Sequence, residues 1–319
     1  MAKMTYGLEL ETVGLTGAQI GRAIEGIDGL EFGGHFGYHG SRVLGLRQAK
    51  MDGSEIVWVT ERDGSLHCSQ TGRTAEIVSP ILHGREGLAH AARVMKAVTR
   101  AGGKVNRTCG THLTMGVRDI SARFRRMGAN AQARVAMIIV EIYDYFNVAF
   151  KSLVSPSRRF NSYCYRPHMS VGVNWSNAER TMGLHDLQTF GTASKATYAA
   201  NLRRVHSQRG QVNLLKFATD GIIEFRMHNG TLNGHKITTW ALLHHQILSF
   251  AANSTSFEDF RNFTPDLEGL MEMLNVGSDL KRDLRARKDE TPVVNHTDYD
   301  IQMMREHTDY IVLINGGVV

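Results

Sequence analysis

The sequence has little proline and cysteine and no long hydrophobic run. Of its 319 residues, 5 are proline and 3 are cysteine, at positions 68, 109 and 164. An odd cysteine count without metal-type spacing is not the pattern of a secreted disulfide scaffold, so we expect a reducing, cytoplasmic location. The longest nearly continuous apolar run, 135–142, is far shorter than the roughly 20 residues of a transmembrane helix, so we expect no membrane span.

Several familiar signatures are also absent. The chain contains neither the G-x-G-x-x-G pattern of dinucleotide-binding proteins nor the phosphate-loop pattern of many nucleoside triphosphatases, and it has no internal repeat. Its composition, 42% hydrophobic and 21% charged, is that of a globular protein. The 37 lysines and arginines outnumber the 31 acidic residues and give a net charge of +6, which favours anionic partners such as nucleotides, nucleic acids or acidic substrates.

The hydrophobic periodicity predicts an α+β fold with a largely antiparallel sheet. Strands are predicted at 5–13, 42–48, 56–61, 74–79, 109–117, 212–218 and 222–228. Helices are predicted at 85–100, 130–150 and 237–252, with a further helix opened by a capping box at Thr16 and Gln19. We expect a glycine-rich loop at 33–40. The chain then divides into a catalytic domain, 1–252, and a helical extension, 253–319, packed on the same domain, with short helices at 265–276 and 279–288.

The first predicted strand carries two carboxylates on one face. Successive side chains of a strand point to opposite faces, so Glu9 and Glu11 share one face while Leu8 and Leu10 share the other. Two like charges about 7 Å apart repel unless water screens them or a cation lies between them. Hard divalent cations such as Mg²⁺ bind carboxylate oxygens, often together with substrate phosphates. A solvated strand face is the simpler explanation of this pair alone.

The strand predicted at 222–228 combines acidic and basic groups. Alternation places Glu224, Arg226 and His228 on one face and three apolar residues on the other. An arginine fork suits a two-hydrogen-bond contact with phosphate or carboxylate. A weak ion pair within the strand would explain the same residues.

Three further segments place polar groups in or beside strands. Glu76 stands in an otherwise apolar strand, where an unpaired carboxylate is rarely buried. His112 alternates with apolar neighbours, a pattern that fits either a core histidine or a ligand. Asp63 and Ser65 flank Gly64 in a predicted turn, which would also suit a plain hairpin tip.

In their order along the chain, these segments resemble the amidoligase family, which comprises carboxylate–amine ligases that are common in bacteria and their phages. The resemblance covers residues 5–246 and rests on the segments Tyr6–Glu11, Asp63–Leu66, Ala75–Pro80, Cys109–His112, Arg159–Tyr163, Tyr198–Leu202 and Ile223–Arg226. It implies a fold similar to that of glutamine synthetase, with a curved, largely antiparallel sheet flanked by helices.

The resemblance also implies an activity and a set of site residues. The activity is ATP- and Mg²⁺-dependent amide formation through an acyl phosphate, with Mn²⁺ as an alternative cation. Four glutamates would bind the metal ions: Glu9, Glu11, Glu76 and Glu224. The nucleotide would contact His112, Arg158, Asn201 and Arg226, and the acid and amine substrates would contact Arg226, Arg159, Asp63 and Ser65. Thr114 departs from the family pattern, which often has a second histidine there.

Two other functions fit parts of the sequence. The basic segments 121–126 and 203–209 suit a nucleic-acid-binding module, or a ligase whose substrate is linked to nucleic acid. A guanidino-kinase-type phosphotransferase would use a similar cluster of carboxylates without joining two substrates. As partners we expect small-molecule or peptide acids and amines, and the sequence leaves open whether the chain forms an oligomer.

Overall fold

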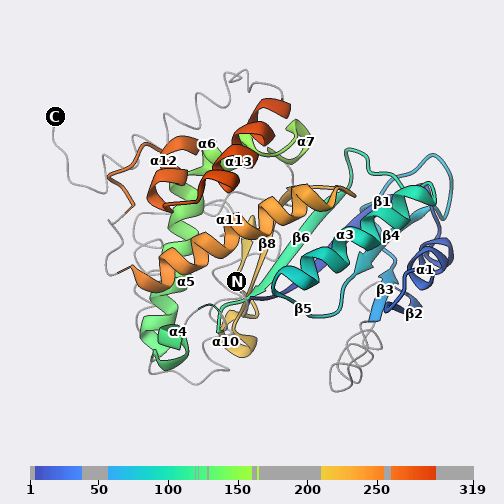
Figure 1. Ribbon diagram of the computed structural model, residues 1–319, viewed down its shortest axis with the longest axis horizontal. Helices are drawn as coiled ribbons and strands as arrows, with labels where there is room; N and C mark the ends of the chain where they lie inside the picture. The colour runs from blue at the N-terminus through green and yellow to red at the C-terminus, as the bar shows by residue number, and fades with distance from the viewer. Residues whose placement is uncertain are drawn as a thin grey trace.

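The computed structural model describes residues 4–37, 57–118, 120, 122–127, 129–159, 164, 210–254 and 260–291. The predicted α+β class is confirmed: helices flank an eight-stranded sheet (Figure 1). β2 pairs with β3 in parallel, and every other described strand pair is antiparallel. The strands follow the order β2 (Glu31–Phe36), β3 (Val57–Glu61), β4 (Thr74–Val78), β1 (Thr5–Val13), β6 (Gly110–Gly116), β8 (Ile222–Asn229) and β7 (Val212–Asn213), with β5 (Leu82–His83) paired to β1.

One apolar layer joins the sheet to its long helices. β1 alternates as predicted, because Tyr6, Leu8 and Leu10 are buried in the main hydrophobic cluster. The same cluster takes in apolar residues from α1 (Gly17–Glu25), α3 (Gly84–Arg100), α5 (Ala129–Tyr145) and α11 (Gly234–Asn253). Burial of this layer drives the packing of the helices against the sheet. Figure 1 shows α3 and α11 crossing the same face of the strands, so the glutamates of β1 point to the other face.

Local sequence signals account for several of the element boundaries. Thr16 begins α1 with the predicted capping box: its hydroxyl accepts a hydrogen bond from the Gln19 amide, and the Gln19 side chain accepts one from the Thr16 amide. The strands predicted around β1, β3, β4, β6 and β8 and the helices predicted around α3 and α11 are confirmed, with ends that shift by a few residues.

One loop prediction and one strand prediction were wrong. The expected loop at 33–40 begins as β2, where glycine permits a close approach to β3: a Cβ on Gly33 would lie 2.6 Å from the Val57 side chain. The strand expected at 212–218 is only the two residues of β7. The Asn213 side chain accepts a hydrogen bond from the Leu215 amide and turns the chain toward α10 (Phe217–Asp220). The strand expected at 42–48 lies outside the described residues.

The single helix expected at 130–150 is divided. α5 ends at Tyr145, and α6 (Asn147–Ser152) begins after Phe146, whose backbone leaves the helical region. The buried Asn147 side chain donates to the Tyr143 carbonyl and to the Gln211 side chain. Such side-chain competition for backbone partners explains why an apolar pattern alone did not reveal the break.

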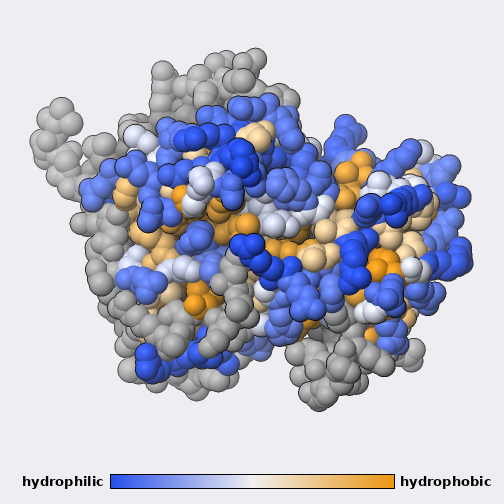
Figure 2. Space-filling model, in the orientation of Figure 1, coloured by the Kyte–Doolittle hydropathy of each residue, from blue (hydrophilic) through white to orange (hydrophobic). Residues whose placement is uncertain are grey.

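Short helices complete the described chain. Two of them, α4 (Ala122–Arg126) and α7 (Pro156–Arg159), flank α5 and α6 in the sequence. The two short helices expected in the extension are present as α12 (Leu267–Met273) and α13 (Ser278–Glu290). Leu270 of α12 and Leu284 of α13 join the main hydrophobic cluster. The surface over these two helices is largely hydrophilic (Figure 2). Among the described residues, no helix is both long and apolar enough to cross a membrane.

Candidate active site

Three glutamates stand directly opposite one another on neighbouring strands. Glu11 of β1 is in register with Glu76 of β4, and Glu76 is in register with Glu61 of β3. All three are buried, with exposed fractions of 5% for Glu11, 6% for Glu76 and 7% for Glu61. Residues opposite one another on adjacent strands have Cβ atoms about 5 Å apart, so three ionised carboxylates in one row would repel strongly. We call these three residues the glutamate row.

Repulsion acts most directly on Glu76, which stands between the other two members of the glutamate row. Burial raises the pKa of Glu76 well above its usual value, and the Glu9 and Glu11 carboxylates raise it further. A proton would neutralise Glu76 alone, whereas a divalent cation would bind several of these oxygens at once. The row is therefore arranged for a bound proton or a bound cation.

His112 links the glutamate row to a second group of carboxylates. It lies opposite Glu9 across β1 and β6, and its Nδ1 is 3.1 Å from a Glu9 oxygen. The same nitrogen is 3.6 Å from a Glu224 oxygen, and Nε2 is 3.8 Å from a Glu11 oxygen. Carboxylates from two strands therefore surround this buried imidazole. The predicted common face of Glu9 and Glu11 is confirmed, and His112 shares it.

Arg226 borders the cluster on the β8 side. Its guanidinium forms an ion pair with one oxygen of Glu224, and Asn213 Nδ2 donates to the other oxygen at 2.7 Å. Burial alone would lower the pKa of Arg226, but the Glu224 and Glu9 carboxylates outweigh this effect and raise it. Arg226 Nη1 is also 3.4 Å from His112 Nδ1. A permanent cation of the protein thus stands beside the carboxylates.

Asp63 and Ser65 form the predicted turn after β3. The Asp63 carboxylate accepts a hydrogen bond from the Ser65 amide at 2.6 Å, which fixes the turn. Asp63 also contributes a carboxylate oxygen to a group with Glu11 and Glu76. The turn therefore brings its aspartate to the glutamate row, while the described hydrogen bond of Ser65 is that of its backbone.

Two sets of side chains are close enough to bind a cation. One set is Glu9, Glu76 and His112, and the other is Glu11, Asp63 and Glu76; within each set the ligand atoms lie within 4.8 Å of one another. Opposite ligands of an octahedral Mg²⁺ site stand roughly 4.2 Å apart, since each bond is about 2.1 Å. The donors are mainly carboxylate oxygens, which hard cations prefer. The residues therefore fit Mg²⁺ or Mn²⁺, with Glu76 shared between two positions.

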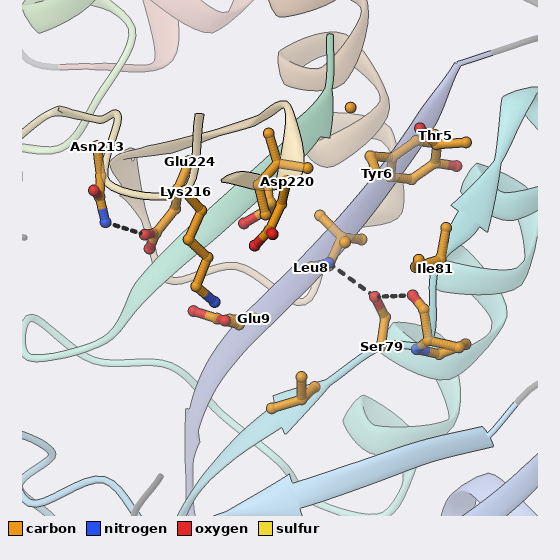
Figure 3. Close-up of a pocket in the computed structure, with 16 residues that line it drawn as sticks. Thr5, Tyr6, Leu8, Glu9, Ser79, Ile81, Asn213, Lys216, Asp220 and Glu224 are labelled. Atoms are coloured by element: carbon orange, nitrogen blue, oxygen red, sulfur yellow. Dashed lines mark hydrogen bonds between the residues drawn. The ribbon is translucent and has the colours of Figure 1, made fainter. Parts of the chain in front are cut away.

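A pocket of about 460 Å³ opens beside this cluster. Glu9 and Glu224 line it, as do Thr114, Ser79 and Ile81 from the neighbouring strands and loops. Its wall also includes Lys216 and Asp220, at the two ends of α10. Figure 3 shows the Lys216 side chain extending toward the Glu9 carboxylate. The pocket thus combines carboxylates at the cluster with one cationic and one acidic side chain from α10.

The structure gives the two adjacent arginines of α7 backbone partners. Arg158 is 2% exposed and its Nη2 donates to the Arg226 carbonyl at 2.5 Å. Arg159 is also buried, and its Nε donates to the carbonyls of Lys151 and Val154 at the end of α6. Arg158 therefore touches the backbone of the site strand, and these bonds of Arg159 fasten α7 to α6. Asn201 lies outside the described residues.

The predicted position of His228 on the face of Glu224 and Arg226 was wrong. The ring of His228 lies 5.0 Å from that of Trp240 in α11, and burial lowers the pKa of His228 to about 3. The register of β6 with β8 shifts just before His228, where one residue of β6 faces two residues of β8. This β-bulge ends the simple alternation before His228.

Three residues of the site were not singled out in the sequence. Glu61 ends a short strand, and only the register of β3 with β4 reveals its place opposite Glu76. Asn213 reaches Glu224 through the pairing of β7 with β8. Lys216 was placed in a strand that the structure replaces with a turn and α10. Each position depends on a long-range pairing or a turn that periodicity does not encode.

A comparison with protein families supports the resemblance inferred from the sequence. The family model described as “putative amidoligase enzyme” matches residues 2–248, which is most of the chain, so the protein belongs to this family. A search among curated proteins found no match. Family membership indicates a ligase-type function.

Proposed function

We propose that this amidoligase is an ATP- and Mg²⁺-dependent ligase that joins a carboxylate to an amine through an acyl phosphate. The observation that carries the proposal is the cluster of buried and half-buried carboxylates around His112, with Arg226 beside it. Such a concentration of buried negative charge suits the binding of divalent cations. An adjoining pocket of about 460 Å³ gives the substrates access to the cluster.

The reaction needs activation because hydroxide is a poor leaving group. An oxygen of the acid substrate attacks the γ-phosphorus of ATP, and ADP leaves. The amine then attacks the acyl carbon of the acyl phosphate, inorganic phosphate leaves, and the nitrogen loses a proton. The first step brings anions together, so cations must reduce their repulsion. The second step develops an oxyanion, which also needs a positive partner.

The side chains of the cluster divide these tasks. Glu76 belongs to both ligand sets and would bind the Mg²⁺ ion of each. The bound ions would supply positive charge to the phosphates. Arg226 adds a fixed guanidinium, held in place by its ion pair with Glu224. Lys216 lines the same pocket as Glu9, and its ammonium group would contact an anionic substrate there.

Asp220 is our candidate for the base that takes the proton of the amine. The acidic side chains of the described pocket wall are Glu9, Glu224 and Asp220. Glu9 belongs to a cation-binding set, and Glu224 is paired with Arg226. The exposed Asp220 carboxylate therefore remains to receive a proton and pass it to water.

Titration calorimetry with a non-hydrolysable ATP analogue tests the proposal. We expect the analogue to bind wild-type protein with Mg²⁺ and to bind at least about tenfold more weakly without it. Glu9→Gln should lose the Mg²⁺-dependent part, whereas Glu86→Gln should behave as wild type, since Glu86 is an exposed residue of α3. Equal binding with and without Mg²⁺, or wild-type binding by Glu9→Gln, would contradict the proposal. Screening pairs of acids and amines for ADP release would then identify the substrates.

The two alternative functions have direct tests as well. A guanidino phosphotransferase would give a phosphorylated guanidine and no amide, so analysis of the product separates it from a ligase. For nucleic acid, the described part of the basic segments offers Arg125 and Arg126, which are exposed on α4. Binding of nucleic acid without ATP or metal, weakened steeply by salt, would favour that function.

A further inference from the structure

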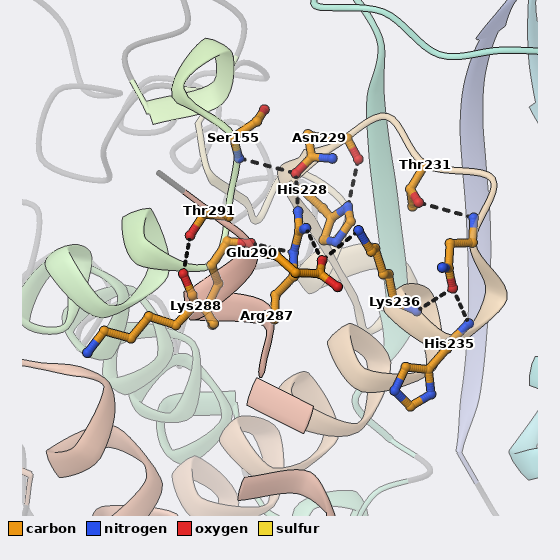
Figure 4. Close-up of polar contacts among 12 residues, drawn as sticks. Ser155, His228, Asn229, Thr231, His235, Lys236, Arg287, Lys288, Glu290 and Thr291 are labelled. Carbon is orange, nitrogen blue, oxygen red and sulfur yellow. Dashed lines mark hydrogen bonds and ion pairs between the residues drawn. The ribbon is translucent and has the colours of Figure 1, made fainter. Parts of the chain in front are cut away.

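An arginine of the C-terminal extension binds the end of a site strand. Arg287 belongs to α13, beyond the residues that match the family, and Figure 4 shows its side chain beside Asn229 and Glu290. Its Nη2 donates to Asn229 Oδ1 at the end of β8, at 2.8 Å. Its Nε donates to the Leu153 carbonyl just after α6, at 3.0 Å. One side chain thus joins α13 both to β8 and to the α6–α7 corner.

Glu290 holds this guanidinium in place. It accepts a hydrogen bond from Arg287 Nη1 at 3.1 Å and lies 2.7 Å from Lys236 Nζ of α11. The Arg287 side chain is only 13% exposed. The partners of Arg287 thus come from the end of β8, from the residue after α6 and from its own helix, and Glu290 adds the link to α11. Hydrogen bonds to a charged, largely buried group are among the stronger ones in proteins.

Asn229 passes the contact on to α7. Its Oδ1 also accepts a hydrogen bond from the Ser155 amide at 3.3 Å, and the Ser155 carbonyl accepts one from the Arg158 amide at 2.9 Å. Ser155 immediately precedes α7, which carries Arg158. The position of Arg158 therefore depends on a turn that Asn229 and Arg287 hold.

Arg158 contacts the backbone of two site strands. Its Nη2 donates to the carbonyl of Arg226 in β8 at 2.5 Å. It also lies against Gly110 of β6 so closely that a Cβ there would come within 3.0 Å of its Nη2. The Gly110 amide in turn donates to the Glu11 carboxylate. Arg158 thus supports the backbone beside one predicted phosphate-binding residue and one predicted metal ligand.

From this series of contacts we infer that Arg287 is a positioning residue for the active site. Acting through Asn229 and Arg158, it fixes the backbone that carries Arg226 and the amide that orients Glu11. The extension is then part of the machinery of this ligase, although it lies outside the family match. The inference deepens the proposed function and rests on it for its kinetic consequence.

Kinetics of Arg287→Gln provide the first test. We expect kcat to fall about tenfold while the KM for ATP changes less than about threefold, because the groups that contact the nucleotide are still present but are less precisely aligned for the transition state. Arg285→Gln is the matched control: Arg285 lies on the same helix and pairs only at the surface with Glu268, so its kcat should stay at the wild-type value. An unchanged kcat in Arg287→Gln would overturn the inference.

A double-mutant cycle separates positioning from a general loss of stability. Asn229→Ala removes the acceptor of the Arg287 hydrogen bond, so we expect it to lower kcat about as much as Arg287→Gln does. Because both changes break one series of contacts, the double variant should be about as active as either single variant. Additive losses, which would multiply to about a hundredfold, would mean that the two residues act independently and would overturn the inference.

Hydrogen exchange provides a readout that needs no substrate. In Arg287→Gln, amides in peptides 108–116 and 222–230 should exchange about tenfold faster than in wild type, and in Arg285→Gln they should not. Wild-type exchange of both peptides in Arg287→Gln would overturn the inference. If the wild-type protein turned over no ATP with any substrate pair, the proposed function would be wrong, and the exchange result would still decide the structural role of Arg287.

Discussion

Replacing Glu76 with glutamine should stabilise the cation-free protein while abolishing its activity. Glutamine has the shape of a protonated glutamate but carries no charge toward Glu11 and Glu61. At pH 7, keeping a proton on a carboxyl group whose usual pKa is 4.5 costs about 3 kcal/mol, at 1.36 kcal/mol per pH unit. The folded protein adopts whichever state of Glu76, protonated or ionised, has the lower free energy. The cost of protonation is therefore the upper limit of the stability that Glu76→Gln can gain.

The assay is thermal unfolding with EDTA and with Mg²⁺. In EDTA at pH 7, Glu76→Gln should melt a few degrees above wild type, and at most about 5 °C above it. Because the pKa of Glu76 is raised in the folded state, the penalty disappears as the pH falls toward 4.5, and the two melting temperatures should converge there.

Mg²⁺ should reverse the order of the two proteins. The ion stabilises only a folded protein that can bind it, so wild type should gain stability with Mg²⁺ and the variant should gain little. Glu86→Gln, which changes an exposed carboxylate of α3, should melt as wild type does throughout. A Glu76→Gln protein that melted below wild type in EDTA at pH 7 would refute the idea of a repulsive glutamate row.

Further predictions concern turnover and acid stability. Glu9→Gln should lower turnover at least about a hundredfold while the melting temperature in EDTA stays at or above that of wild type; near-wild-type turnover would exclude Glu9 as a metal ligand. Arg226→Lys should be costly as well, because lysine cannot bind Glu224 and substrate with a planar fork; full activity would make Arg226 purely structural. Burial lowers the pKa of His228 and of His244 to about 3, so the unfolded state takes up protons first as the pH falls below about 6.5. The test is urea unfolding at pH 5 and pH 8 in EDTA, measured on Glu76→Gln because the titration of Glu76 has the opposite effect on stability. The free energy of unfolding should be lower at pH 5 by about 2 kcal/mol per histidine, and equal stabilities would contradict the burial of these rings.

The sequence predicted the parts of the site that follow from strict alternation. Glu9 and Glu11 share a face because β1 runs without interruption from Thr5 to Val13. His112 alternates in the same way, and its position opposite Glu9 follows once β1 and β6 pair. Period-two patterning was sufficient here because one face of each strand packs on the helices and the other does not.

The remaining features depend on distant pairings that the sequence does not show. Glu61 joins the glutamate row only through the register of β3 with β4. His228 leaves the expected face because a bulge in β8 changes the alternation. The nucleotide contact of Arg158 stays a prediction, and the structure adds a hydrogen bond to the carbonyl of Arg226 that no sequence pattern indicates. A sequence identifies an arginine, but the backbone groups that it contacts depend on tertiary structure.

Diffraction from crystals grown with Mn²⁺ and a non-hydrolysable ATP analogue tests the central claim most directly, since the anomalous signal of Mn²⁺ locates each ion. The account predicts two peaks, one among Glu9, Glu76 and His112 and the other among Glu11, Asp63 and Glu76, with the phosphates of the analogue on the same side of the sheet. Phosphates and Mn²⁺ bound elsewhere, with Glu76 bound to no ion, would contradict it.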